Sequence, residues 1–178
     1  MALNKRLADF SLLILTAAVI VLLDQATKRL VRAHLAYGEV YRPDLWITQY
    51  ARVVNLKNYG MLGGIFPQLS SLWTLASFLV SLAIIYGFAR TPTTEHWIRL
   101  GWGFLLGGAI GNLIDRLHQG FVTDFLSLGS LPALNIADIS VIIGLMMLAI
   151  GIWQQDKAGP PLDQRSHPPT FTGGTGRE

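Results

Sequence analysis

Four long apolar stretches constrain the fold of this chain more than any other feature. They cover about residues 10–31, 69–89, 97–117 and 135–153 of the 178 residues. A helix needs about 20 mainly apolar residues to cross a bilayer, and each stretch is of that size. Only 14% of the residues are charged, whereas a soluble domain usually has about 25%. We therefore expect an all-α polytopic membrane protein with four transmembrane helices.

The first apolar stretch has a second interpretation, as a secretory signal peptide. Lys5 and Arg6 precede an apolar run, which is the order of charged and apolar regions in such a peptide. A small-x-small cleavage site does not follow Leu23, because Asp24 and Gln25 come next. Together with the three further stretches, this favours an uncleaved first helix.

The distribution of Lys and Arg does not decide the membrane orientation. Four spans put both termini on one side, together with the loop between the second and third spans. Seven Lys and Arg residues lie on that side and seven on the other. Basic residues prefer the cytoplasmic side of a membrane, but equal numbers on the two sides favour neither orientation.

Residues 32–68, between the first two stretches, are too many for a plain connector. Within them, residues 45–56 are rich in β-branched and aromatic side chains and predict one or two short strands. Trp46 and Tyr50 suit the headgroup level of a membrane. At the other end, residues 158–178 are dominated by Pro, Gly, Ser and Thr and predict a disordered tail. Residues 1–157 would then form a single four-span domain.

The composition excludes several kinds of site. The chain has no cysteine, which rules out a disulfide framework, a thiol nucleophile and a zinc–thiolate centre. Its four histidines form no H-x-x-x-H pair, and the net charge of +3 is dispersed. We expect no metal, no cofactor and no nucleic-acid partner.

Two aspartates fourteen residues apart, Asp124 in V-T-D-F and Asp138 in N-I-A-D, lie between and at the start of the last two apolar stretches. A carboxylate at the edge of a bilayer is costly and usually functional. Two carboxylates at close range share a proton, so one can act as general base on water while the other protonates a leaving group. The connecting loop is short enough to fold back and bring them together. Asn135 also suits a helix N-cap with Asp138 three residues on, and this structural interpretation can hold alongside the catalytic one.

Other polar residues lie in apolar surroundings. Asp24 and Lys28 are four apart and share a helix face, so an ion pair that closes the helix end is at least as well supported as a role in chemistry. Asn112, Asp115 and Arg116 also share one helix face. They could form an interfacial anchor in which Asp115 is the partner of Arg116. Asn112 needs polar partners in any membrane setting, which favours a polar site at this helix end.

Small residues recur every four positions in the third stretch, at Gly103, Gly107 and Gly111. Such a stripe allows another helix to approach closely within a membrane. We interpret it as a packing surface.

Five motifs occur in order along the chain, and together they resemble the bacterial lipoprotein signal peptidases (signal peptidase II, aspartic peptidase family A8). The resemblance covers about residues 10–153. The motifs are D-Q-A-T-K at 24–28, N-Y-G at 58–60, G-N-L-I-D-R at 111–116, V-T-D-F at 122–125 and N-I-A-D at 135–138.

The resemblance implies an intramembrane aspartic endopeptidase. Such an enzyme removes the signal peptide from diacylglyceryl-prolipoproteins by cutting before the lipidated lipobox cysteine. By resemblance, Asp124 and Asp138 are the catalytic dyad. Substrate-binding positions would be Asn58, Gly60, Asn112, Arg116 and Asn135, and supporting positions would be Asp24, Lys28 and Asp115.

The resemblance also implies a location in the bacterial inner membrane. Both termini would be cytoplasmic and the active site would lie near the outer face, under a small extracytoplasmic β platform and a short mobile helix around residues 61–68. The partners would be prolipoprotein substrates and membrane phospholipid, and we expect a monomer. The chain departs from the family pattern at Lys57 and at Met61, Leu62 and Gly63. These departures concern the grip on the substrate and leave the dyad unaffected.

Other functions stay open beside the peptidase. A proton-coupled transporter could use Asp24, Asp115, Asp124 and Asp138 as a relay, but these acids cluster toward one membrane face, whereas a relay should cross it. A non-catalytic assembly factor could share the helix packing. A serine–lysine peptidase is disfavoured, because Lys28 has no serine near it in the sequence.

Overall fold

The computed structural model describes residues 2–42, 46–91 and 96–158. The described residues form four α-helices, α1 (Ala2–His34), α2 (Ser70–Arg90), α3 (His96–Gln119) and α4 (Ile136–Ala158). Each helix covers one of the four predicted stretches, so the helical part of the prediction is confirmed. The predicted tail lies outside the described residues from residue 159 onward.

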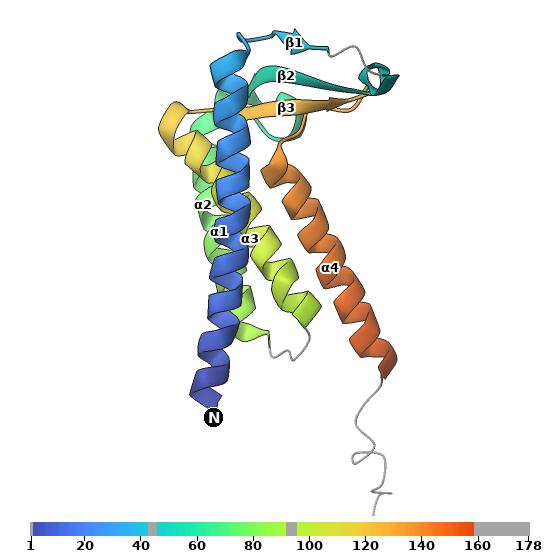
Figure 1. Ribbon diagram of the computed structural model, residues 1–178. Coiled ribbons are helices and arrows are strands. Elements are labelled where there is room, and N and C mark those ends of the chain that lie inside the picture. The colour runs from blue at the N-terminus through green and yellow to red at the C-terminus, as the bar shows by residue number, and fades with distance from the viewer. Residues whose placement is uncertain (1, 43–45, 92–95, 159–178) are drawn as a thin grey trace, which may run out of the picture.

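Three of the helices are long and apolar enough to cross a membrane: the spans are Ala8–His34, Pro67–Arg90 and Ile136–Lys157. Helix α3 does not meet this criterion, because charged residues such as Arg99, Asp115 and Arg116 interrupt its apolar sequence. It packs against each of the other three helices. A helix surrounded by protein can carry polar groups at low cost, since they find partners there. The chain is thus a mostly helical, multi-pass membrane protein (Figure 1).

The glycine stripe of α3 faces α1, as expected. A Cβ atom on Gly103 would lie 2.6 Å from Thr16 Cβ, and one on Gly107 would lie 2.7 Å from Ile20 Cβ. In lipid, helices associate through close packing rather than through burial of apolar surface from water, so this contact matters for the bundle. Leu13 of α1, Phe88 of α2 and Leu105 of α3 meet in the core beside it.

A three-stranded antiparallel sheet lies across the end of the bundle remote from the N-terminus (Figure 1). Its strands are β1 (Val40–Tyr41), β2 (Ala51–Asn58) and β3 (Val122–Leu128), in the order β1-β2-β3. The first two strands come from the segment between α1 and α2, and the third comes from between α3 and α4. The sheet therefore joins two segments that are far apart in the sequence.

One local prediction was wrong, and a second holds for only part of its segment. The segment with Asp124 was expected to be a loop, but it is strand β3, with Asp124 opposite Leu56 of β2. Residues 122–125 are all buried, so the alternation typical of a half-exposed strand is missing from the sequence. The prediction of one or two short strands within residues 45–56 is confirmed by β2. The first part of that segment, Trp46–Gln49, forms a 3₁₀ helix instead, and residue 45 lies outside the described residues.

The expected short helix around residues 61–68 corresponds to two 3₁₀ turns, Leu62–Gly64 and Pro67–Leu69. Between them Phe66 has a positive φ of 54°. The segment connects the end of β2 to the start of α2, and its Gly63 and Gly64 line the same cavity as Asp124.

Candidate active site

Asp124 and Asp138 come together at Asn135. The side-chain amide of Asn135 donates to Asp124 Oδ1 at 2.8 Å, and its backbone N–H donates to Asp138 Oδ2 at 3.1 Å. The backbone brings these groups together because Leu134 forms an antiparallel bridge with Leu126 of β3. Both carboxyl groups therefore bind one buried residue.

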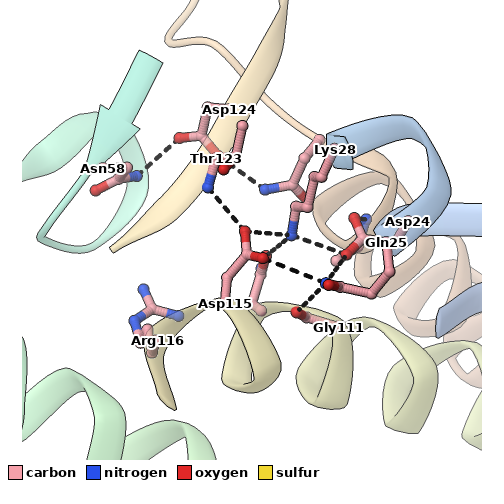
Figure 2. Close-up of polar contacts among 12 residues, drawn as sticks. Asp24, Gln25, Lys28, Asn58, Gly111, Asp115, Arg116, Thr123 and Asp124 are labelled. Atoms are coloured by element: carbon pink, nitrogen blue, oxygen red, sulfur yellow. Dashed lines mark hydrogen bonds and ion pairs between the residues drawn. The ribbon is translucent and has the colours of Figure 1, made fainter. Parts of the chain in front are cut away.

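The remaining oxygen of each carboxyl group accepts a hydrogen bond from a different element. Asn58, at the end of β2, donates its amide to Asp124 Oδ2 at 2.9 Å (Figure 2). Asn112 of α3 donates its amide to Asp138 Oδ1 at 2.8 Å. Each carboxylate oxygen can accept a second hydrogen bond, so the pair retains acceptor capacity for water or substrate.

Asn135 and Asp138 also form the capping box predicted for the start of α4. The backbone N–H of Asp138 donates to Asn135 Oδ1 at 2.9 Å, and Asp138 Oδ2 accepts from the backbone N–H of Asn135. The N-terminal end of a helix favours a negative charge. The capping interpretation is thus confirmed, and it holds Asp138 beside Asp124.

The pKa of Asp124 is raised to about 6, first by burial of the carboxyl group and then by the negative charge of Asp138. The hydrogen bonds from Asn58 and Asn135 and the charge of Lys28 act in the opposite direction and are weaker. Asp124 is only 4% exposed, which agrees with desolvation as the main cause. The carboxyl group of Asp124 therefore exchanges its proton near neutral pH.

Lys28 is fully buried and pairs with two further acids. Its Nζ lies 2.8 Å from Asp24 Oδ2 and 3.3 Å from Asp115 Oδ2 (Figure 2). It also donates to Asn112 Oδ1 at 2.9 Å. Because the amide oxygen of Asn112 points at Lys28, its NH₂ group must point at Asp138. The predicted Asp24–Lys28 pair is confirmed, and it orients a residue that contacts Asp138.

Asp115 of α3 binds strand β3 at Thr123, the residue before Asp124. Its Oδ2 accepts the backbone N–H of Thr123 at 2.9 Å, as Figure 2 shows, and its Oδ1 lies 3.6 Å from Arg32. Arg32 in turn donates to Thr123 Oγ1 at 2.8 Å. Asp115 thus pairs with Lys28 and Arg32, so the interpretation of Asp115 as the partner of Arg116 was wrong.

Arg116 binds the N-Y-G turn that follows β2. Its guanidinium donates to the carbonyl oxygen of Gly60 at 3.0 Å and to Ser77 Oγ at 3.3 Å. The backbone N–H of Gly60 donates to Asn58 Oδ1 at 2.9 Å, which turns the Asn58 amide toward Asp124. A Cβ atom on Gly60 would lie 2.1 Å from the carbonyl oxygen of Ile65, so only glycine fits there.

A cavity of about 460 Å³ opens beside Asp124. Two of the positions that depart from the family pattern, Lys57 and Gly63, line this cavity together with Asn58 and Pro132. Gly63 has a φ of +72°, a conformation that favours glycine. Among the residues that the structure describes, groups of three or more His, Asp or Glu suited to a metal ion are absent.

Three residues of this network were missed in the sequence. Thr123 is fully buried and joins β3 to Asp115 and Arg32. Gln25 donates to the carbonyl oxygen of Gly111 at 3.1 Å and to Asp24 at 3.2 Å. The third missed residue is Arg32. Gln25 follows Asp24 directly and Arg32 is four residues after Lys28, so both lie close to the predicted ion pair on one helix. Nothing in the sequence indicates the partners of these three residues.

Comparisons with known proteins agree over most of the chain. The model of the family described as signal peptidase (SPase) II matches residues 16–154. The lipoprotein signal peptidase of Gloeobacter violaceus is 36% identical over 166 residues, which cover 90% of this chain and 94% of that protein. The lipoprotein signal peptidase of Halothermothrix orenii is 33% identical over 141 residues, which cover 79% of this chain and 94% of that protein.

Solved structures support the same fold. A bacterial membrane enzyme determined by the in meso method at 2.3 Å resolution superposes with a TM-score of 0.75 and 24% identity, covering 83% of this chain and 91% of its own. A second bacterial membrane enzyme, determined by the same method at 1.9 Å resolution, superposes with a TM-score of 0.70 and 26% identity. The match covers 79% of this chain and 91% of that one. Sequence motifs, fold and family model agree, and the chain therefore belongs to the signal peptidase II family of aspartic peptidases, family A8.

Proposed function

We propose that this protein removes the signal peptide from diacylglyceryl-prolipoproteins, as an intramembrane aspartic endopeptidase that cuts before the lipidated lipobox cysteine. The two relatives described above are named lipoprotein signal peptidases, which supports the substrate class. The single observation that carries the proposal is the binding of Asp124 and Asp138 to the same buried residue, Asn135.

In this proposal Asp124 holds the proton of the pair and Asp138 is ionised. With a pKa of about 6, protonating Asp124 at pH 7 costs about 1.4 kcal/mol, whereas an aspartate of ordinary pKa would cost about 4 kcal/mol. Asp138 lies in the first turn of α4, where the helix dipole favours its charge. The helix dipole at Asp138 and the deep burial of Asp124 support this choice of proton position.

The reaction then follows from these two protonation states. Asp138 takes a proton from water while the water oxygen attacks the scissile carbonyl carbon. The carbon–nitrogen bond breaks as the amine of the lipobox cysteine takes the proton of Asp124. A peptide and a water become a carboxylic acid and an amine, and the pair ends with its one proton on Asp138 instead of Asp124. The reaction uses neither a metal nor a covalent intermediate.

Asn58, Asn112 and Asn135 orient the pair in this scheme, because their amides already bond its four oxygens. Arg116 and Gly60 fix the turn that carries Asn58. Bound side chains of this kind need no reorganisation when substrate arrives. The cavity beside Asp124 would hold the peptide around the scissile bond.

The membrane arrangement completes the proposal. We infer four spans with both termini in the cytoplasm, which puts the sheet and the pair near the outer face of the inner membrane. A substrate anchored by its signal helix and acyl chains meets the enzyme in that layer. The chain would work as a monomer with no cofactor, and its substrate-facing β platform would lie at the membrane surface.

The transporter alternative is less well supported by the arrangement of the acids. Asp24, Asp115, Asp124 and Asp138 form one connected cluster at the sheet end of the bundle. At the other end Asp9 pairs with Arg99. A proton relay needs titratable groups across the bilayer, and the described spans do not supply a continuous row.

The test is hydrolysis of two matched lipobox peptides by the purified protein. One peptide carries a diacylglyceryl group on its cysteine, and the other carries the free thiol. We expect cleavage of the lipidated peptide alone, with product masses that identify the bond before the cysteine. Cleavage at another bond, or equal cleavage of both peptides, would contradict the proposed substrate.

A further inference from the structure

A polar hollow of about 160 Å³ lies between α1 and α3, and it shares no lining residue with the cavity beside Asp124. From α1, Gln25, Arg29 and Arg32 line it, and their spacing of four and three residues puts them on one helix face. From α3, Asp115, His118 and Gln119 complete it. The hollow has several times the volume of a water molecule, about 30 Å³.

The hollow offers hydrogen-bond donors that converge on one place. Arg29 and His118 are exposed, and neither forms a hydrogen bond or ion pair with any residue that the structure describes. Arg32 uses one guanidinium nitrogen on Thr123 and Asp115, and a guanidinium has five N–H groups in all. The one acid, Asp115, is buried and already accepts from Lys28 and the Thr123 backbone.

The hollow lies near the end of an apolar span, where lipid headgroups would be expected. Arg29 is five residues before the end of the span Ala8–His34, which is about 8 Å along a helix. The apolar side chains of Leu30 and Leu117 beside it are exposed, as a lipid-facing surface would be. Tyr37, just beyond the span, is also exposed, and tyrosine favours the membrane interface.

We propose that this hollow binds the phosphate of a membrane phospholipid, with anionic phospholipid preferred. A guanidinium fork matches a phosphate in geometry and charge, and Arg29, Arg32 and the imidazole of His118 line the hollow. The acyl chains would lie along the exposed leucines of α1 and α3. Through Arg32 and Thr123 the bound lipid would hold strand β3, and with it Asp124, at headgroup depth.

Plain snorkelling of arginines at a helix end is the competing interpretation. It predicts that each basic residue at this membrane face contributes equally and independently of the others. The proposed site instead predicts that Arg29 and His118 act together, and that an exposed arginine elsewhere in the insert, Arg42, contributes nothing.

Lipid binding to the full-length protein in detergent micelles tests the proposal without any substrate. Phosphatidylglycerol and diacylglycerol with the same chains are titrated, and bound lipid is counted by native mass spectrometry. We expect retention of phosphatidylglycerol, about fivefold weaker in Arg29→Gln, weaker still when His118→Gln is added, and unchanged in Arg42→Gln. Both altered residues are exposed, so the variants should fold, and Arg29→Lys should regain part of the binding.

Three outcomes would overturn the proposal. Equal retention of phosphatidylglycerol and diacylglycerol would show binding through the chains alone. An equal loss in Arg42→Gln would show nonspecific attraction to basic charge. Displacement of the lipid by millimolar inorganic phosphate would assign the hollow to a soluble anion. Because turnover is not measured, failure here leaves the proposed peptidase activity untouched.

Discussion

Asn135 donates its side-chain amide to Asp124 at 2.8 Å, while its amide oxygen caps helix α4. One side chain therefore serves the proposed acid and the fold at the same time. Substitutions that separate these two roles show which of them the activity needs.

Asn135→Ser should keep the helix cap and lose the bond to Asp124. Serine is a good N-cap, but its side chain is too short to reach the carboxyl group. A hydrogen bond to a charged group contributes about 1.5–3 kcal/mol, so we expect kcat to fall by about 10- to 100-fold with nearly normal thermal stability. Asn135→Ala should show the same fall in kcat together with a loss of about 1 kcal/mol in stability. Unchanged kcat in Asn135→Ser would show that the bond to Asp124 is dispensable.

Removal of the Lys28 charge should destabilise the whole bundle. Lys28→Met leaves Asp24 buried without its cation and leaves Asp115 with only the longer, 3.6 Å contact to Arg32. Breaking a buried ion pair in this way costs about 3–5 kcal/mol. Thermal unfolding in detergent measures the loss. Lys57→Met is the matched control, because Lys57 is exposed and its loss should cost less than about 1 kcal/mol.

Asp24 should prove structural rather than catalytic. Asp24→Asn removes one charge of the buried pair and weakens the bond from the backbone N–H of Ala137 at 2.9 Å. We expect a lower unfolding temperature and a lower yield, with kcat per folded molecule largely kept. Loss of turnover in a normally folded Asp24→Asn protein would assign Asp24 a direct role. The double variant with Lys28→Met should lose less stability than the sum of the two single variants.

The raised pKa of Asp124 predicts how stability depends on pH. In the native state this pKa is about 6, against an ordinary value of 3.8 in the unfolded chain. The stabilisation from the proton is therefore complete below about pH 4 and is lost as the pH rises through 6. The shift corresponds to about 3 kcal/mol. Asn at this position does not titrate. The stability of Asp124→Asn relative to the wild type should therefore rise by about 3 kcal/mol between pH 4 and pH 8, and a constant difference over this range would contradict burial of the ionised carboxylate.

Arg116 should act through the turn that it binds. Arg116→Lys keeps the charge, but a single ammonium cannot reach both the carbonyl of Gly60 and Ser77 in the geometry of the guanidinium fork. We expect kcat to fall by about tenfold or more as Asn58 loses its fixed orientation toward Asp124. Ser77→Ala removes only the longer, 3.3 Å bond and should change kcat less than about threefold. Equal effects of the two substitutions would contradict the role of the Gly60 contact.

The helices and their packing could be predicted because the signals are local. Apolar length predicts each helix, and the four-residue spacing of Asp24 and Lys28 predicts their pair. The glycine stripe at 103, 107 and 111 predicts close approach of another helix, which the structure shows to be α1. Each of these signals lies within a single helix. The same is true of the capping box at Asn135.

Strand β3 could not be predicted in this way, because its hydrogen-bond partners in β2 are far away in the sequence. Its register puts Asp124 opposite Leu56 and next to Asn58, and no local pattern contains that information. The partners of Arg116 and Asp115 escaped prediction for a related reason. Both bind backbone groups, the carbonyl of Gly60 and the N–H of Thr123, and a backbone group carries no sequence signal.

The most direct test of the paired-acid mechanism is the turnover of a lipidated lipobox peptide by Asp124→Asn and Asp138→Asn, each shown to insert and fold. General acid–base groups contribute about 10²–10⁴-fold, so each variant should lose at least a hundredfold in kcat. Because the acids act as a unit, the double variant should be no slower than the slower single variant. Asp156→Asn, at an exposed carboxylate near the end of α4, should keep full activity. If either Asp124→Asn or Asp138→Asn retains more than about a tenth of the wild-type rate, the two carboxyl groups do not share the chemistry.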